Sequence, residues 1–168
     1  MNNPSTLSPV AALYRGYAGI LDKGQSLLLL LIRLTWGFQF AQTGWGKWHD
    51  IPKVVGFFTN IGIPLPTLNA YVVATTELVG GTFLLLGLLS RLTPIPLIIS
   101  MIVAYATTEQ DALHSLISGN PDPFLTAAPF LFLFASLIVF VFGPGAFSLD
   151  RLWLGKSGDF EKSSRAVK

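Results

Sequence analysis

Two ionisable side chains, Arg33 and Glu77, lie near the middle of long apolar stretches of the sequence. A charge at the centre of a lipid bilayer costs on the order of 3 kcal/mol, so each residue needs a partner or a change of protonation. An ion pair between them would satisfy both, and Glu77 could alternatively be protonated. Two interpretations stay open: a bridge that sets the register of two helices, and a polar site that meets a substrate, a proton or a quinone headgroup.

Each of these charges stands on a stripe of small residues at helical spacing. The stripe near Arg33 contains Gly37, Ala41 and Gly44, and the stripe near Glu77 contains Ala70, Ala74 and Gly81. Small residues let helix backbones approach closely in lipid, so both stripes are predicted helix contacts. The two charges would then point into a helix bundle.

A second group of polar and aromatic side chains is predicted at the outer ends of the apolar stretches. Its members are Gln42, Trp45, Lys47, Trp48, His49 and Tyr105. This predicted rim could bind a polar ligand or a quinone ring, whereas anchoring at the interface is the simpler role of its tryptophans. The histidines and nearby carboxylates match no ligand spacing, so no metal site is expected.

The composition indicates a membrane protein. Of the 168 residues, 51% are hydrophobic and 12% are charged, with a mean hydropathy of +0.58. A soluble chain of this size would expose large apolar patches, which a lipid bilayer would cover. Cysteine is absent, which excludes thiolate metal sites and iron–sulfur clusters, and no basic stripe suggests nucleic acid. No intrinsic cofactor is expected.

Four stretches approach the roughly 20 residues that a membrane-spanning helix needs. The predicted spans are 24–45, 68–89, 92–108 and 124–142 within a single domain, 1–168, preceded by a surface segment, 1–23, and followed by a tail, 143–168. The expected fold is an all-α integral membrane four-helix bundle. The segment that starts at Ser8-Pro9 is expected to form either an interfacial helix or a partly ordered tail. Eight basic residues share the side of the termini and two lie opposite, which predicts that both termini are cytoplasmic.

Several motifs, in this order, resemble the DoxX family of bacterial inner-membrane proteins. They are Arg33-Leu34 with Gly37, Phe40 and Gly44 to Lys47; Phe57 to Pro64; Glu77-Leu78-Val79-Gly80-Gly81 through Leu86-Gly87-Leu88 to Arg91; and Phe142 to Gly145 with Ser148-Leu149-Asp150-Arg151. The resemblance covers about residues 26 to 152. The positions that carry over from the family motif are Arg33, Gly44, Lys47, Glu77, Gly81 and Arg91.

The resemblance implies a multi-pass protein of the bacterial inner membrane with a link to redox biology, since related members include subunits of a thiosulfate:quinone oxidoreductase. It favours a membrane subunit of, or accessory to, a quinone-linked oxidoreductase or oxidative-stress complex. Such a subunit would depend on a protein partner or a quinone for its redox chemistry. Two alternatives remain: a non-catalytic scaffold or assembly factor, and a small-solute transporter that works as a homo-oligomer.

Overall fold

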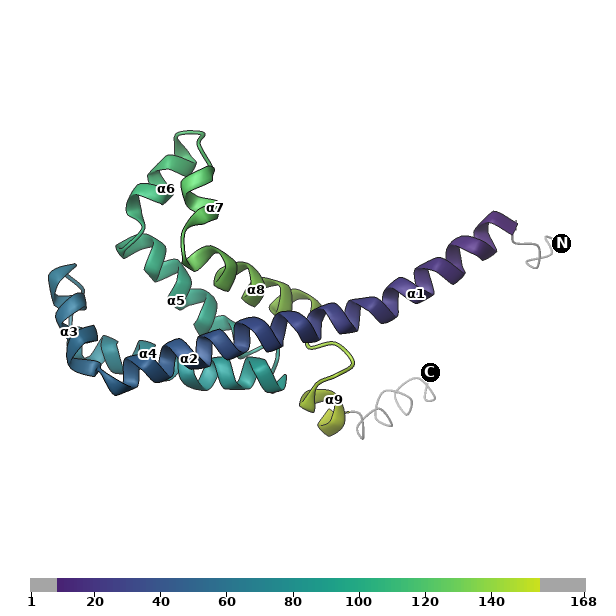
Figure 1. Ribbon diagram of the computed structural model, residues 1–168, viewed down its shortest axis with the longest axis horizontal. Coiled ribbons are helices and arrows are strands. Elements are labelled where there is room, and N and C mark those ends of the chain that lie inside the picture. The colour runs from purple at the N-terminus through teal and green to yellow at the C-terminus, as the bar shows by residue number, and fades with distance from the viewer. Residues whose placement is uncertain (1–8, 155–168) are drawn as a thin grey trace, which may run out of the picture.

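The computed structural model describes residues 9–154, and these residues form helices and connecting turns without a strand. Figure 1 shows one long helix running the length of the molecule, with shorter helices packed beside it and projecting from it. The all-helical class predicted from the sequence is therefore confirmed for the described residues.

The long helix is built from α1 (Pro9–Ile32), a π-helical turn η1 (Arg33–Gly37) and α2 (Phe38–His49). It is continuous because the residues at both joints keep right-handed helical dihedral angles. The described part of this helix begins at Pro9, and the predicted N-cap, Ser8, lies outside the described residues. No break separates the expected surface segment from the expected span at residue 24, and the first turns of α1 project beyond the other helices (Figure 1).

Three further apolar helices fall on the other predicted spans: α4 (Pro66–Leu86), α5 (Pro94–Thr107) and α8 (Pro129–Phe142). Each has proline in its first turn, where the missing N–H has no intrahelical partner to lose. Among the described helices, α4 is the one that is long and apolar enough to cross a membrane by itself, and α5 and α8 are apolar but have 14 residues each.

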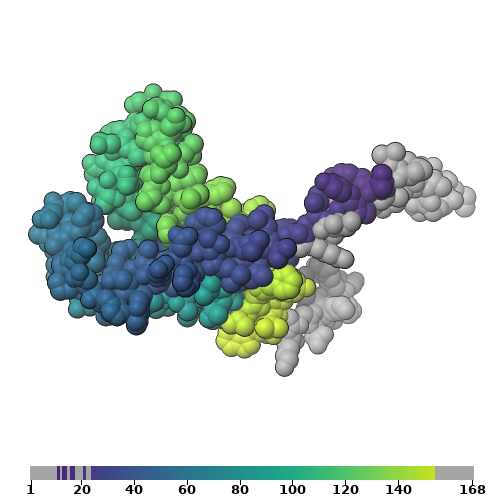
Figure 2. Space-filling model, in the orientation of Figure 1, coloured from purple at the N-terminus to yellow at the C-terminus, as the bar shows by residue number. Residues whose placement is uncertain are grey.

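Three short helices lie between or after the predicted spans, and a fourth overlaps the start of the last predicted span. They are α3 (Ile51–Asn60), α6 (Gln110–Ile117), α7 (Asp122–Thr126) and α9 (Leu149–Leu154). Helix α7 takes the start of the fourth predicted span, because Ala127 is extended and α8 begins only at Pro129. Figure 2 shows α3 and the α6–α7 pair as separate projections from the end opposite the start of α1.

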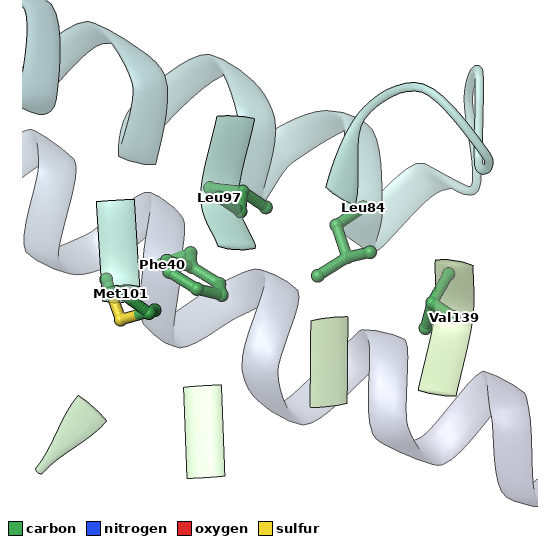
Figure 3. Close-up of a cluster of buried hydrophobic side chains, with 5 residues drawn as sticks. All are labelled: Phe40, Leu84, Leu97, Met101 and Val139. Carbon is green, nitrogen blue, oxygen red and sulfur yellow. The ribbon is translucent and has the colours of Figure 1, made fainter. Parts of the chain in front are cut away.

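The core joins α2, α4, α5 and α8 (Figure 3). It consists of Phe40, Leu84, Leu97, Met101 and Val139. Phe40 also meets the ring of Phe132 edge-on, with 4.6 Å between the centroids. Because each of the four helices contributes to one cluster, the long helix is tied to the other three by side-chain packing.

The backbones of α2 and α4 approach most closely along the predicted small-residue stripes. A Cβ atom at Gly37, Gly44 or Gly81 would lie 2.6 Å from the Leu85 nitrogen, 2.3 Å from the Leu78 nitrogen and 2.4 Å from the Ala41 nitrogen, respectively. Since residue numbers rise along α2 as they fall along α4, the two helices are antiparallel. Ala70 and Ala74 on α4 are fully buried.

Candidate ligand-binding cleft

Glu77 is buried on α4, directly beside the Gly44 contact, where its main-chain carbon would lie 2.8 Å from a Cβ atom at that glycine. The ammonium group of Lys47, one helical turn beyond Gly44 on α2, donates a hydrogen bond to Oε2 of Glu77 and forms an ion pair with it. The side chain of Lys47 is 31% exposed and that of Glu77 is 4% exposed. Lys47 therefore connects a buried carboxylate to the surface.

The predicted ion pair between Arg33 and Glu77 is wrong, because Glu77 pairs with Lys47 and Arg33 binds elsewhere. The register of the glycine contacts explains the difference. With residue 44 opposite residue 78 and residue 37 opposite residue 85, Arg33 lies level with the C-terminal end of α4. The same register puts Arg33 twelve residues from the level of Glu77, or roughly 18 Å along the helix at 1.5 Å per residue.

Arg33 is fully buried at that end and donates a hydrogen bond through Nη2 to the carbonyl oxygen of Phe147. Its Nε and Nη1 atoms have no hydrogen-bond partner. The guanidinium fills the space beside Gly87, where a Cβ atom would lie 1.7 Å from Nη1. Arg33 thus holds the segment after α8 against the end of α4.

Asp150, three residues after Phe147, binds the turn that follows α4. Its carboxylate accepts hydrogen bonds from the backbone N–H groups of Leu89 and Ser90, both at 2.8 Å. Its own N–H donates to the carbonyl oxygen of Gly87 at 3.0 Å. Sequence reasoning did not assign this role to Asp150, although the Ser148-Leu149-Asp150-Arg151 motif contained it.

A cleft of about 830 Å³ opens beside the Lys47–Glu77 ion pair, between α2, α3, α4 and α5. Its apolar wall includes Val54, Phe57, Phe58, Val73, Met101 and Val103. Its other polar side chains include Asp50, Lys53, Thr107, Thr108 and Glu109. Helix α3 is needed for this enclosure, and it is stabilised by Asp50, whose side chain accepts a hydrogen bond from the N–H of Lys53.

Of the predicted rim, Lys47 lines this cleft and the other five residues do not. Four of them, Gln42, Trp45, Trp48 and His49, are exposed side chains of α2. The rings of Trp45 and His49 lie 4.4 Å apart, and Trp48 meets Tyr71 edge-on at 5.4 Å. Tyr105 is buried on α5 and donates a hydrogen bond to the carbonyl oxygen of Phe124 at 2.7 Å.

The face of α2 that does line the cleft carries Thr43, Gly46, Lys47 and, just past the helix end, Asp50. Their spacing of three and four residues is that of one helix face and was the available signal. Between residues 9 and 154, no three His, Cys, Asp or Glu side chains are grouped so that they could hold a metal ion. The cleft therefore combines apolar walls with one lysine–carboxylate pair.

Comparison with known proteins identifies the family. The DoxX family model matches residues 28–110. The "Uncharacterized membrane protein Rv3486" of Mycobacterium tuberculosis is 35% identical over 135 residues, which cover 73% of this chain and 79% of that protein. The "Putative oxidoreductase CatD" of Bacillus subtilis is 30% identical over 102 residues, which cover 61% of this chain and 72% of that protein. No solved structure matches the chain. The resemblance seen in the motifs is confirmed: the chain belongs to the DoxX family and is a membrane protein.

Proposed function

We propose that the chain is a membrane subunit of, or accessory to, a quinone-linked oxidoreductase, and that the cleft beside Lys47 and Glu77 binds the quinone. The observation that carries the proposal is a buried carboxylate paired with lysine in the wall of a mainly apolar cleft. Ligand sites of this kind have apolar walls and a few polar groups that fix orientation. A quinone matches that description, since its ring is apolar and its polar atoms are carbonyl oxygens.

Lys47 would donate a hydrogen bond to a carbonyl oxygen of the quinone, since an ammonium group has three donors and Glu77 accepts one of them. Glu77 would hold Lys47 in position and pass protons to the quinone oxygens at the buried end of the cleft, because reduction of a quinone to the quinol takes up protons. A bound quinone would supply the redox chemistry by accepting electrons from a protein partner. The name of the Bacillus subtilis relative supports an oxidoreductase connection.

The same proposal includes a multi-pass orientation in the bacterial inner membrane. The four crossings would be the helix α1–η1–α2 and the helices α4, α5 and α8, with both termini cytoplasmic. In support, α1 begins and α9 lies toward the same end of the molecule (Figure 1). Fourteen helical residues span about 21 Å against a hydrocarbon core of about 30 Å, so the bilayer would thin beside α5 and α8.

Binding measurements test the proposed function. The purified chain in lipid nanodiscs should bind decylubiquinone or menaquinone-4 saturably in calorimetric titration. Lys47→Met should weaken this binding at least tenfold, because it removes the donor from the cleft. Arg91→Met is the control, since Arg91 is exposed and lines a different cavity. If neither quinone binds saturably to the unaltered protein, the proposal is refuted.

A further inference from the structure

We infer that a side chamber between α2, α5 and α8 holds the hydrocarbon tail of the ligand whose ring lies in the cleft. The inference rests on the proposed function and adds a selectivity to it. The site would take quinones that carry a chain and would discriminate against free rings. The residues that decide this are those that line the chamber and not the cleft, which lie on α2, on α8 and just before α8.

The chamber has a volume of about 190 Å³ and adjoins the cleft. Both cavities are lined by the same five residues along their common boundary: Thr43, Lys47, Glu77, Met101 and Ala104. The ion pair therefore lies where the two cavities meet. A ring placed against Lys47 in the cleft has the chamber directly behind it.

The two cavities differ in volume, so each can hold a different part of the ligand. Sites for whole ligands of drug size have volumes of roughly 300–1,000 Å³. The cleft, at about 830 Å³, falls within this range and the chamber falls below it. The chamber is large enough for a stretch of chain and too small for a ring together with its chain.

The lining favours hydrocarbon. The residues that line the chamber and not the cleft are Phe40, Ala128, Pro129 and Phe132, and none carries a polar side-chain atom. Along the cleft, by contrast, a chain would pass charged side chains such as Lys53 and Glu109. Since hydrocarbon gains nothing from charged groups and would displace their water, the chamber is the better place for the tail.

Ala128 is the position at which to test this placement. It is exposed and lines the chamber. Its backbone is right-handed helical, so a larger side chain needs no unusual backbone conformation there. Ala128→Phe should fill the chamber while leaving the cleft open. Ala106→Phe is the matched control, because Ala106 is exposed on α5 and lines neither cavity.

The experiment compares two pairs of probes in nanodiscs: decylubiquinone with 2,3-dimethoxy-5-methyl-1,4-benzoquinone, and menaquinone-4 with menadione. Ala128→Phe should weaken binding of the tailed quinone at least tenfold and that of its free ring less than twofold, with Ala106→Phe changing neither. Unchanged binding of the tailed quinone, or equal loss for both probes, would overturn the inference and leave the proposed function standing. Failure of all four probes to bind the unaltered protein would remove both.

Discussion

Lys47 of α2 reaches Glu77 of α4 one helical turn beyond the point at which Gly44 lets the two backbones touch. The contact and the ion pair are linked, because the distance between the helix axes decides whether the lysine can reach the carboxylate. Gly81 makes the matching approach from α4 toward Ala41. Helix packing and the chemistry of the cleft therefore depend on the same few glycines.

Replacing Gly44 with alanine should destabilise the protein. The new methyl group would lie 2.3 Å from the backbone nitrogen of Leu78, and backbone cannot move aside as a flexible side chain can. Overpacking of this kind costs about 1–3 kcal/mol. Thermal unfolding in detergent, followed by circular dichroism, should show a lower Tm for Gly44→Ala than for the unaltered chain.

Gly46→Ala is the control for this prediction. It makes the same change two residues along α2, where a Cβ atom would meet nothing within 4 Å. Helix propensity alone would make it more stable by up to about 1 kcal/mol. Equal Tm values for the two variants would show that the backbones of α2 and α4 lie farther apart at Gly44 than in the structure.

The two members of the ion pair should respond differently when each is neutralised. Lys47→Met leaves a buried carboxylate without a cation, which should cost roughly 1–3 kcal/mol. Glu77→Gln leaves a lysine that is 31% exposed and can turn toward water, so it should cost less than about 1 kcal/mol.

A double-mutant cycle measures this coupling. The variant that combines Lys47→Met with Glu77→Gln should recover stability relative to Lys47→Met, since no unpaired charge remains buried. The readout is again thermal unfolding, analysed for all four members of the cycle. Strict additivity of the two single changes would mean that the pair contributes no interaction energy.

The helix contacts were predictable from the sequence, but the partner of each charge was not. Small residues at spacings of three and four mark a close helix contact wherever it forms, so Gly37, Gly44 and Gly81 identified the α2–α4 interface. The sequence indicates how deep a charged residue lies in the membrane only through its distance from the ends of its apolar stretch. The helix that carries Arg33 extends from residue 9 to residue 49, so the midpoint of a stretch says little about its level in the bundle.

The cleft was less predictable because its enclosure depends on tertiary contacts. Spacing groups Thr43 with Lys47, but it does not say which face of α2 meets α4 and which face borders a cavity. Helix α3 was also missed, although Asp50 followed by Pro52 is a helix-start signal. Its ten residues are too few for a membrane span, and they lie between the predicted spans 24–45 and 68–89.

At the other end of the molecule, Gly87→Ala should loosen the segment that Arg33 holds. The added methyl group would lie 1.7 Å from Nη1 of Arg33, at a residue with φ of +68°. Displacing the guanidinium should also disturb Asp150 and the two backbone N–H groups bound to it. Hydrogen exchange at Leu89 and Ser90 should become at least tenfold faster.

Gly119→Ala measures the cost of a positive φ at a site without this clash. Gly119 has a similar φ of +88°, but a Cβ atom there would meet nothing within 4 Å. Both variants therefore carry the cost of a positive φ, about 1 kcal/mol, and only one carries the contact with Arg33. If exchange at Leu89 and Ser90 accelerates equally in both, Arg33 does not hold this segment.

The orientation in the membrane can be tested with single cysteines, because the natural chain contains none. Ser118 lies after α6 and Leu152 lies on α9, and both are exposed. With both termini in the cytoplasm and α6 on the outer side, a membrane-impermeant maleimide added to intact spheroplasts should label Ser118→Cys and leave Leu152→Cys unlabelled. Permeabilised cells should label both, which shows that each thiol is reactive. The opposite pattern in intact spheroplasts would invert the orientation and place the cleft on the cytoplasmic side, where its electron-donating partner would also have to be sought.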